Sequence, residues 1–379
     1  MKQPRTKLRI AVLVKRFICT GGAERYAVEI TRRMVDRGHS VDLYARVAAA
    51  GLTEGLIYHR VPSKYAFSSV LNSLHFASET ARMIHKEQGG YDIIHSHEKG
   101  WIQDLMTIHT FSWKGSMLGH ALTARRLQAI LSPRSLLYLW LEKKQMSTPW
   151  LVPVSEVIKT DVDSNFNPKI EMNTIVPGVD VDWFNPSWVK KYRKKRRTEE
   201  GLRDHEIVVL FVGSEFRRKG LDFVIRAIGP GMRLLVVGAG ERMRHYRKLV
   251  HEQRMASQVH FKGLVADIRA FYAVADIVVL PSVSEAFGMS ILEAMACGLC
   301  VVVTQNSGVS ALIQHGKNGF VLTHPSQMGE TLSELAYSDL RHHIGRKARD
   351  TAEQYTWDRA ADQYERLYYR IGEARFRIR

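Results

Sequence analysis

The sequence is poor in cysteine, with only Cys19, Cys297 and Cys300 among its 379 residues. Three irregularly spaced cysteines exclude a disulfide framework and match no zinc-ligand spacing. Cys297 and Cys300 form a C-x-x-C pair, but they fall at the end of a predicted helix and at the start of an apolar strand. We therefore expect no redox role for this pair and a reduced, cytosolic protein.

Long hydrophobic runs are also missing. No uncharged stretch approaches the roughly 20 residues that a membrane-spanning helix needs. The opening "MKQPRTKLRIAVLVKR" has an apolar core of only about five residues, which predicts a first strand rather than a signal peptide. We expect a chain that does not span a membrane.

Acidic residues are scarce relative to basic ones: 38 Asp and Glu stand against 55 Lys and Arg, a formal charge of +17. Such an excess favours a polyanionic partner, namely nucleic acid, an anionic membrane or a phosphorylated substrate. Part of it is concentrated in "KKYRKKRR", residues 190–197, which we expect to be a solvated surface run.

Short apolar runs that alternate with amphipathic segments predict an α/β fold. "LRIAVLV" is typical of a buried parallel strand, and it precedes a glycine turn, a helical pattern and the strand "VDLYA". The same order recurs from "EIVVLFVG" onward, with a turn-rich boundary at 172–186. The pattern predicts two Rossmann-like doubly wound domains that face each other across a cleft: residues 1–172, joined by a C-terminal helix at about 357–379, and residues 173–356.

Two glycine-containing turns follow predicted strands. Gly21 and Gly22 allow a ligand to approach the backbone where a helix begins. In "GSEFRRKG", residues 213–220, Arg217, Arg218 and Lys219 follow the first strand of the second domain. Cations fixed there would stabilise a leaving diphosphate more strongly in the transition state than in the ground state. The alternatives are a plain tight turn and a solvated basic loop.

"SEAFGMSILEAMACG" places two glutamates around a predicted helix start. Gly288, Met289 and Ser290 are predicted to offer backbone N–H groups to an anion. Glu285 precedes them and Glu293 follows about two turns later, so the two carboxylates suit the hydroxyl groups of an extended ligand. The alternatives are a loop or capping role for Glu285 and a partly exposed helix position for Glu293.

In this order, the motifs resemble the retaining GT-B glycosyltransferases of glycosyltransferase family 4 (group 1). The resemblance covers nearly the whole chain and is carried by "TGGAERYAVEITRRMVDRGHSVDLYA", "IIHSHE", "TIHTF", "VSEVIKTD", "IVPGVDVDWFNP", "FVGSEFRRKGLDFVIRAI", "VVGAGE", "FKGLVADIRAFYAVADIVVLPS" and the E-x7-E signature "SEAFGMSILEAMACG". Many members have arginine where this chain has Ser214. The lipopolysaccharide-core glucosyltransferases share that serine.

The resemblance implies a role for each candidate residue. Gly22, next to Gly21, would place its backbone against the donor diphosphate, and Arg218 and Lys219 would clamp it. Glu285 would contact the donor sugar and Glu293 the ribose. The remaining assignments are the amides of Phe287, Gly288, Met289 and Ser290 for sugar and phosphate, the backbone near Leu264 for the base, and His109 beside the anomeric carbon.

We expect neither a metal nor a cofactor, with a nucleotide diphosphate sugar as co-substrate. The two D-x-D pairs, at 161–163 and 180–182, do not follow suitable strands. His95 and His97 alternate on a strand without requiring an ion, and we expect His97 to line the cleft. UDP-glucose is the expected donor, and GDP-mannose is the next candidate.

Residues 111–146 mix aromatic and basic side chains. Such amphipathic segments bind anionic membrane surfaces, although ordinary helices that cover a sheet are the alternative. The segment and the charge predict a peripheral enzyme on the inner face of the cytoplasmic membrane that acts on a glycolipid or lipopolysaccharide-core acceptor. The residues concerned are Trp113, Lys114, Arg125, Arg126, Arg134, Leu136, Tyr138, Trp140, Lys143 and Lys144.

Other functions stay open at this point. A nucleotide-sugar epimerase or a phosphorylase would keep the fold and change the chemistry. A basic nucleic-acid-binding protein would explain the charge, but no helix-turn-helix, zinc-finger or RNA-binding motif supports it. A dinucleotide oxidoreductase is disfavoured because "VGAGERM" lacks the third glycine of the fingerprint.

Overall fold

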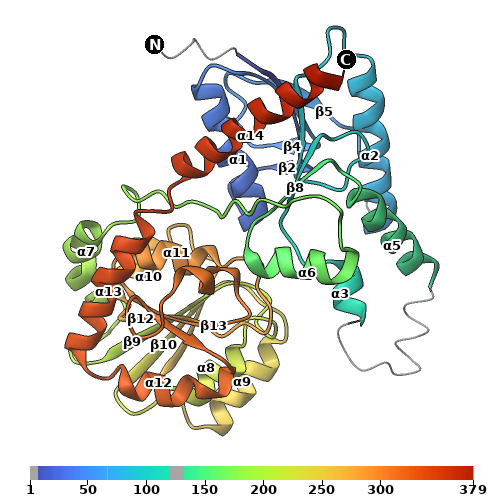
Figure 1. The fold of residues 1–379 in the computed structure, drawn as a ribbon. Helices are drawn as coiled ribbons and strands as arrows, with labels where there is room; N and C mark the ends of the chain where they lie inside the picture. Colours follow the sequence, from blue (N-terminus) through green and yellow to red (C-terminus); the bar gives the residue numbers. More distant parts are fainter. Residues whose placement is uncertain (1–6, 66, 119–131, 379) are drawn as a thin grey trace. The chain divides into compact units, whose positions relative to one another are not determined.

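The computed structural model describes residues 7–65, 67–118 and 132–378, which form two compact units. The first unit contains the chain up to Val176 together with the residues from Trp357 onward. The second unit is continuous from Pro177 to Thr356. The chain therefore leaves its first unit, builds the second, and returns to the first with its last helix (Figure 1).

The first unit is built on a six-stranded parallel sheet in the order β5-β3-β1-β6-β7-β8. Its strands are short and mostly apolar because helices cover both faces of such a sheet. A two-stranded parallel ribbon of β2 and β4 adjoins it. The strands are β1 (Arg9–Leu13), β2 (Arg16–Phe17), β3 (Ser40–Ala45), β4 (Val47–Ala48), β5 (Ile57–Arg60), β6 (Ile93–Ser96), β7 (Leu105–Ile108) and β8 (Trp150–Pro153).

The C-terminal helix of the chain packs against the first helix of this unit (Figure 1). Arg37 pairs with Glu365 at 3.0 Å and with Asp362 at 2.6 Å, and Arg33 pairs with Asp358 at 2.7 Å. These ion pairs fix α14 to α1 across more than 300 residues of sequence. The helices are α1 (Gly22–Asp36), α2 (Ser69–His85), α3 (Trp113–Leu118), α5 (Pro133–Gln145), α6 (Glu156–Phe166) and α14 (Trp357–Ile378).

The second unit has a parallel six-stranded sheet with the equivalent order, β11-β10-β9-β12-β13-β14. Its central strands are almost wholly apolar, and Val209, Phe211 and Val279 are buried in one core cluster. The strands are β9 (Ile207–Val212), β10 (Met232–Val237), β11 (Val259–Gly263), β12 (Ile277–Leu280), β13 (Cys300–Thr304) and β14 (Phe320–Leu322).

Helices complete the layers of the second unit (Figure 1). Helix α8 contacts α9 and α12, whereas α7 contacts α10 and α11 contacts α13. The segments are α7 (Pro186–Glu199), α8 (Leu221–Ala227), α9 (Met243–Glu252), α10 (Arg269–Val274), α11 (Met289–Ala296), η1 (Gly308–Leu312), η2 (Pro325–Gln327), α12 (Met328–Glu334) and α13 (Ser338–Ala352). The two sheets of parallel strands confirm the predicted pair of Rossmann-like domains.

The prediction for residues 190–197 is wrong in part. This run lies on α7, and Arg197 is only 3% exposed. Its guanidinium donates to the carbonyl oxygens of Val274, Arg203 and Glu206 and pairs with Asp276. Arg193 also pairs with Asp276, at 2.6 Å. Arg193 and Arg197 therefore hold α7 to α10 and to the start of the sheet, through backbone carbonyl groups and the Asp276 carboxylate.

Candidate active site

The second unit brings its candidate residues to one place in the sheet. In the order β11-β10-β9-β12-β13-β14, strands β10 and β11 lie on one side of β9, and β12 to β14 lie on the other. The strand order therefore reverses between β9 and β12, although all the strands are parallel. Ligands of doubly wound sheets bind beyond the carboxyl ends of the strands at such a switch point. The loop that carries Arg218 and Lys219 follows β9, and the loop that carries Glu285 follows β12. The topology therefore explains how residues about 67 positions apart meet.

Arg218, Lys219 and Glu285 are in direct contact. The Arg218 Nη1 and the Lys219 Nζ each lie 3.2 Å from the same Oε2 of Glu285. The Glu285 and Lys219 side chains are 12% and 15% exposed, whereas that of Arg218 is 32% exposed. Burial acts to lower the pKa of Arg218, but the Glu215 and Glu285 carboxylates outweigh it and raise this pKa. The contact forms a fixed, partly desolvated pair of cations that can bind an anion.

Glycine is required where this loop meets its neighbours. Gly220 has a φ of +78°, and a Cβ atom there would lie 2.2 Å from the carbonyl oxygen of Pro281. Any larger residue would push the Arg218 loop away from the Glu285 loop. A backbone hydrogen bond from Val283 N to the Arg218 carbonyl oxygen, at 2.8 Å, joins the same two loops. Close backbone packing therefore sets the separation between the cations and Glu285.

Glu215 was not recognised from the sequence. It has a φ of +55°, a left-handed conformation that is unfavourable for glutamate. Its Oε2 accepts hydrogen bonds from Arg218 Nε at 3.1 Å and from Nη2 at 2.6 Å. Nothing in the sequence distinguishes this glutamate from an ordinary loop residue, because its importance depends on that backbone conformation.

The predicted helix start is present at α11. Its N-cap is Gly288, with a φ of +106°, and within the described chain no side chain caps this end. Phe287 is buried and its carbonyl oxygen accepts a hydrogen bond from Val309 N at 2.8 Å. Met289 and Ser290 form the first turn. The amino end of α11 thus follows Glu285 directly, with backbone N–H groups suited to an anion.

Glu293 is 7% exposed, so the alternative of a partly exposed helix position is wrong. The hydroxyl group of the fully buried Tyr272 donates to its Oε2 at 2.9 Å. Sequence reasoning missed Tyr272, because α10 is short and any aromatic residue there would be expected in the core.

Leu264 is 80% exposed just after β11, which leaves its backbone accessible at the carboxyl end of that strand.

In the first unit, Gly21 and Gly22 lie where α1 begins. Gly21 is the N-cap of α1, with a φ of +96°, and a Cβ atom there would lie 2.4 Å from Glu24 Oε2. Gly22 is the first residue of the helix. This turn follows β1 and the short β2, so it stands near the carboxyl end of a central strand. Its positive φ favours glycine at position 21, whereas the crowding atom is the end of the flexible Glu24 side chain, which can move aside.

His97 and His109 meet after the two neighbouring strands β6 and β7. His97 Nδ1 lies 3.0 Å from His109 Nε2, and the ring of His109 packs edge-on against Tyr26 at 5.1 Å between centroids. Both histidines are half-buried. Burial lowers the pKa of His109 to about 3. Burial and two neighbouring histidines hold the pKa of His97 well below its usual range. Both rings are therefore neutral near pH 7.

A buried network lies beneath this pair. His95 contacts Tyr368 Oη and Thr107 Oγ1 at 2.7 Å each, and the Thr107 hydroxyl contacts Tyr364 Oη at 2.7 Å. Burial lowers the pKa of His95 to about 3. Since Tyr364 and Tyr368 belong to α14, the last helix of the chain supports the histidine strands from behind. The sequence predicted the helix but not these contacts.

The D-x-D pairs have structural roles. Asp161, on α6, accepts a hydrogen bond from Ser112 N at 2.7 Å, and Asp180 accepts from the backbone of Asp182 and Trp183. Among the described residues, no group of three or more His, Cys, Asp or Glu side chains has the arrangement of a metal site. Cys297 and Cys300 are buried, and burial raises the pKa of Cys300 to about 12.

Comparison with known families identifies both halves of the chain. The family model described as glycosyl transferases group 1 matches residues 192–351, and the model described as Glycosyltransferase Family 4 matches residues 20–183. The chain is a group 1 glycosyltransferase of the family 4 type. It is 26% identical over 404 residues to a D-inositol 3-phosphate glycosyltransferase of Corynebacterium jeikeium, and this alignment covers 93% of each protein. A protein of the same name from Pseudarthrobacter chlorophenolicus is 28% identical over 386 residues, 90% of this chain and 88% of that one.

Solved structures support the fold of the glycosyltransferase. WaaG, a glycosyltransferase involved in lipopolysaccharide biosynthesis, aligns with a TM-score of 0.81 and 22% identity, over 93% of this chain and 98% of that chain. Anabaena HepE in complex with UDP-glucose aligns with a TM-score of 0.71 and 19% identity, over 95% and 99%. The GT-B fold is therefore confirmed, and the chain is an enzyme that transfers sugars from nucleotide sugars.

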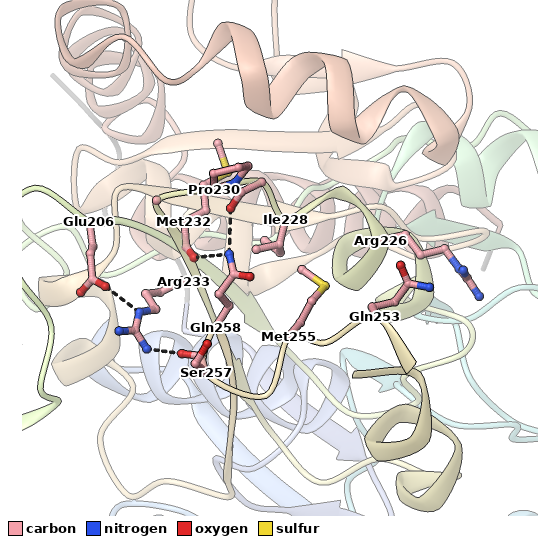
Figure 2. Close-up of a pocket in the computed structure, with 12 residues that line it drawn as sticks. Glu206, Arg226, Ile228, Pro230, Met232, Arg233, Gln253, Met255, Ser257 and Gln258 are labelled. Carbon is pink, nitrogen blue, oxygen red and sulfur yellow. Dashed lines mark hydrogen bonds and ion pairs between the residues drawn. The ribbon is translucent and has the colours of Figure 1, made fainter. Parts of the chain in front are cut away.

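One pocket of the glycosyltransferase lies away from these residues. It encloses about 550 Å³ at the amino ends of the strands, where Glu206 precedes β9, Met232 begins β10 and Gln258 precedes β11. Figure 2 shows Arg233 paired with Glu206, and Gln258 bonded to the carbonyl group of Met232. Gln258 also donates to the carbonyl oxygen of Gly229 at 2.9 Å. Because doubly wound sheets bind substrates at the opposite ends of their strands, we do not place the active site in this pocket.

Proposed function

We propose that the protein is a retaining, metal-independent hexosyltransferase that uses a UDP-sugar, with glucose as the hexose. The observation that carries this proposal is the convergence of Arg218, Lys219 and Glu285 at the switch point of the second unit. Two fixed cations suit a diphosphate, and the adjacent carboxylate suits sugar hydroxyl groups. The UDP-glucose in the complex of Anabaena HepE, a protein of the same fold, favours this donor.

The chemistry then depends on the leaving group. As the bond between the anomeric carbon and the diphosphate breaks, negative charge grows on the diphosphate oxygens. Arg218, Lys219 and the amino end of α11 at Gly288 stabilise that charge without reorganising. The acceptor attacks from the face that the diphosphate leaves, which retains the configuration, and a donor phosphate oxygen takes the acceptor proton.

His109 acts in this scheme as a neutral hydrogen-bonding group. Burial lowers its pKa to about 3, and its Nε2 lies 3.0 Å from His97 Nδ1. Because one ring donates and the other accepts, the tautomers of His97 and His109 are coupled. We infer that His109 orients the donor sugar and does not act as a nucleophile.

For the acceptor we propose a phosphorylated glycolipid of the lipopolysaccharide-core type at an anionic membrane. Helix α5 presents Leu136 and Trp140, about half exposed and one helical turn apart. Lys144 Nζ lies 5.6 Å from the ring centroid of Trp140 and 5.0 Å from that of Trp101. Exposed apolar side chains beside lysines are typical of a surface that binds anionic lipids. Arg125 and Arg126 lie outside the described residues.

Across the described residues, none of the helices has both the length and the apolar content needed to cross a membrane. A peripheral position on the inner face of the cytoplasmic membrane therefore stays a proposal, which rests on the α5 surface. The similarity to the D-inositol 3-phosphate glycosyltransferases favours a second candidate acceptor, a small phosphorylated polyol. Both candidates carry a phosphate that the excess positive charge would attract.

The donor is tested by thermal unfolding with UDP-, GDP- and ADP-sugars. A ligand that binds only the folded state adds about 2.7 kcal/mol at a hundredfold excess over its Kd. We expect the largest shift from UDP-glucose and its loss in Arg218→Ala. A folded protein whose melting temperature no nucleotide sugar changes would contradict the donor assignment. The appearance of an epimer with donor alone would identify an epimerase instead.

The acceptor is tested by transfer from the donor so identified, first to a lipopolysaccharide-core acceptor and then to inositol 3-phosphate. Sedimentation with vesicles of phosphatidylglycerol and phosphatidylcholine, against phosphatidylcholine alone, tests the surface. We expect selective binding to the anionic vesicles, weakened in Leu136→Ser/Trp140→Ser. Equal binding by this variant would exclude α5 as the lipid-binding surface.

A further inference from the structure

We propose that Glu215 is a competing anion that occupies Arg218 until the donor diphosphate displaces it, and so weakens donor binding and speeds release of the nucleoside diphosphate. This inference rests on the proposed donor site. All three guanidinium nitrogens of Arg218 already have protein acceptors: Nε and Nη2 donate to Glu215, and Nη1 donates to the Ser284 carbonyl oxygen at 2.5 Å and to Glu285 at 3.2 Å.

The two carboxylates on Arg218 differ in their exposure. Glu285 is 12% exposed and also pairs with Lys219, so it is held in place. Glu215 is 64% exposed, and Arg218 is its only ion-pair partner among the described residues. An exposed ion pair contributes only about 0.2–1 kcal/mol. Glu215 can therefore release the guanidinium at little cost, whereas Glu285 cannot.

The backbone keeps Glu215 in this competing position. Its φ of +55° is unfavourable for a residue that has a Cβ atom, and such conformations persist only where the surroundings enforce them. The Lys219 N–H donates to the Glu215 carbonyl oxygen at 3.0 Å, which closes the turn that carries both side chains. The strained turn thus places an acid within reach of the cation that a diphosphate needs.

Donor binding then exchanges one anion for another on the guanidinium group of Arg218. The Nε–Nη2 edge of Arg218 gives up the Glu215 carboxylate and receives a phosphate oxygen pair in its place. The freed carboxylate remains near the diphosphate and repels it, because both are negative. When the sugar has been transferred, the return of Glu215 to Arg218 assists departure of the nucleoside diphosphate.

The test is the affinity of Glu215→Gln for UDP, measured by titration calorimetry with GDP in parallel. We expect the Kd for UDP to fall about two- to fivefold, which corresponds to the loss of one exposed competing pair. The affinity for uridine, which has no phosphate, is expected to stay unchanged. Because the effect is electrostatic, it is expected to shrink at about 0.5 M salt. Glu252→Gln is the matched control: Glu252 is an exposed acid paired with Lys248 at the end of α9.

Weaker UDP binding by Glu215→Gln would overturn the inference, since it would show that Glu215 positions Arg218 for the donor. Unchanged UDP binding would overturn it as well. Glu215→Gly separates charge from strain: tighter binding by this variant but not by Glu215→Gln would assign the effect to the backbone and reject competition. If the folded parent protein binds neither UDP nor GDP, the proposed donor site fails instead.

Discussion

The two units present opposite chemistry at the carboxyl ends of neighbouring strands in sheets of equivalent order. Beyond β9 and β12, the second unit holds Arg218, Lys219 and Glu285 as ion pairs. Beyond β6 and β7, the first unit holds His97 and His109 as neutral rings whose pKa values are lowered by burial. One strand order therefore supports a charged site in one unit and an uncharged hydrogen-bonding site in the other. The difference lies in the loops and in what is buried behind them.

The difference has a physical basis in what each site must bind. A diphosphate carries a charge before and after the reaction, so fixed cations bind it, and nearby carboxylates prevent those cations from repelling each other while the site is empty. A sugar and its acceptor are held by hydroxyl groups, which suit neutral donors and acceptors. We therefore expect substitutions in the second unit to depend on salt and those in the first unit to depend on pH.

The largest effect is expected from Lys219→Ala. Removing one fixed cation from the leaving-group site is expected to lower kcat about 10²- to 10³-fold, as for the loss of an oxyanion-hole donor. Initial rates of nucleotide release measure the change, and circular dichroism checks the fold. Lys248→Ala, which removes an exposed cation paired with Glu252, is the control. A loss in Lys219→Ala no greater than in this control would remove the contrast between the two units.

The next effect separates cations that hold the fold from cations that bind substrate. Arg197→Ala leaves Asp276 and three carbonyl groups without their buried donor, so we expect a loss of about 3 kcal/mol in the free energy of unfolding. Lys195→Ala, in the same charged run but 72% exposed, is expected to change it little. Urea unfolding measures both variants. Equal stability of the two would mean that the Arg197 contacts contribute nothing.

The sequence predicted the two domains well, because the buried parallel strands are short apolar runs followed by helical patterns. It also placed Arg218, Lys219 and Glu285 together, because motifs after two strands of a doubly wound sheet meet at the switch point. The edge strands β5 and β14 escaped prediction: β5 is largely exposed, and β14 has three residues, so neither forms a clear apolar run.

Side chains whose role depends on tertiary contacts were also missed. Glu215 matters because its backbone is left-handed, Tyr272 because it reaches Glu293, and Arg197 because its helix packs onto Asp276. Charge and amphipathic patterns describe the average environment of a residue and cannot distinguish a buried arginine from its exposed neighbours on one helix. A joint site across an interdomain cleft stays a prediction.

The pH dependence of stability tests the neutral network in the first unit. The pKa of His95 is about 3 in the folded protein and about 6.5 in an unfolded chain. Between these values the unfolded chain binds more protons, so the free energy of unfolding falls as the pH is lowered. One such histidine accounts for about 2 kcal/mol between pH 6.5 and pH 5. We expect this acid sensitivity to decrease in His95→Gln and to persist in His251→Gln, by urea unfolding at both pH values. An unchanged pH dependence in His95→Gln would show that this ring is not held neutral.

The smallest effect concerns the hydrogen bond from the Tyr272 hydroxyl group to the Glu293 carboxylate in the second unit. Tyr272 donates to Glu293 Oε2 at 2.9 Å, so it orients the carboxylate that we assign to the ribose. Tyr272→Phe removes that donor without opening a cavity, and we expect the KM for UDP-glucose to rise about fivefold, or about 1 kcal/mol, with kcat unchanged. Tyr337→Phe, at a 74% exposed position, is the control. A fall in kcat with KM unchanged would move Glu293 from donor binding to the chemical step. It would also show that the second unit uses a neutral contact in the transition state, which the contrast between the two units assigns to the first.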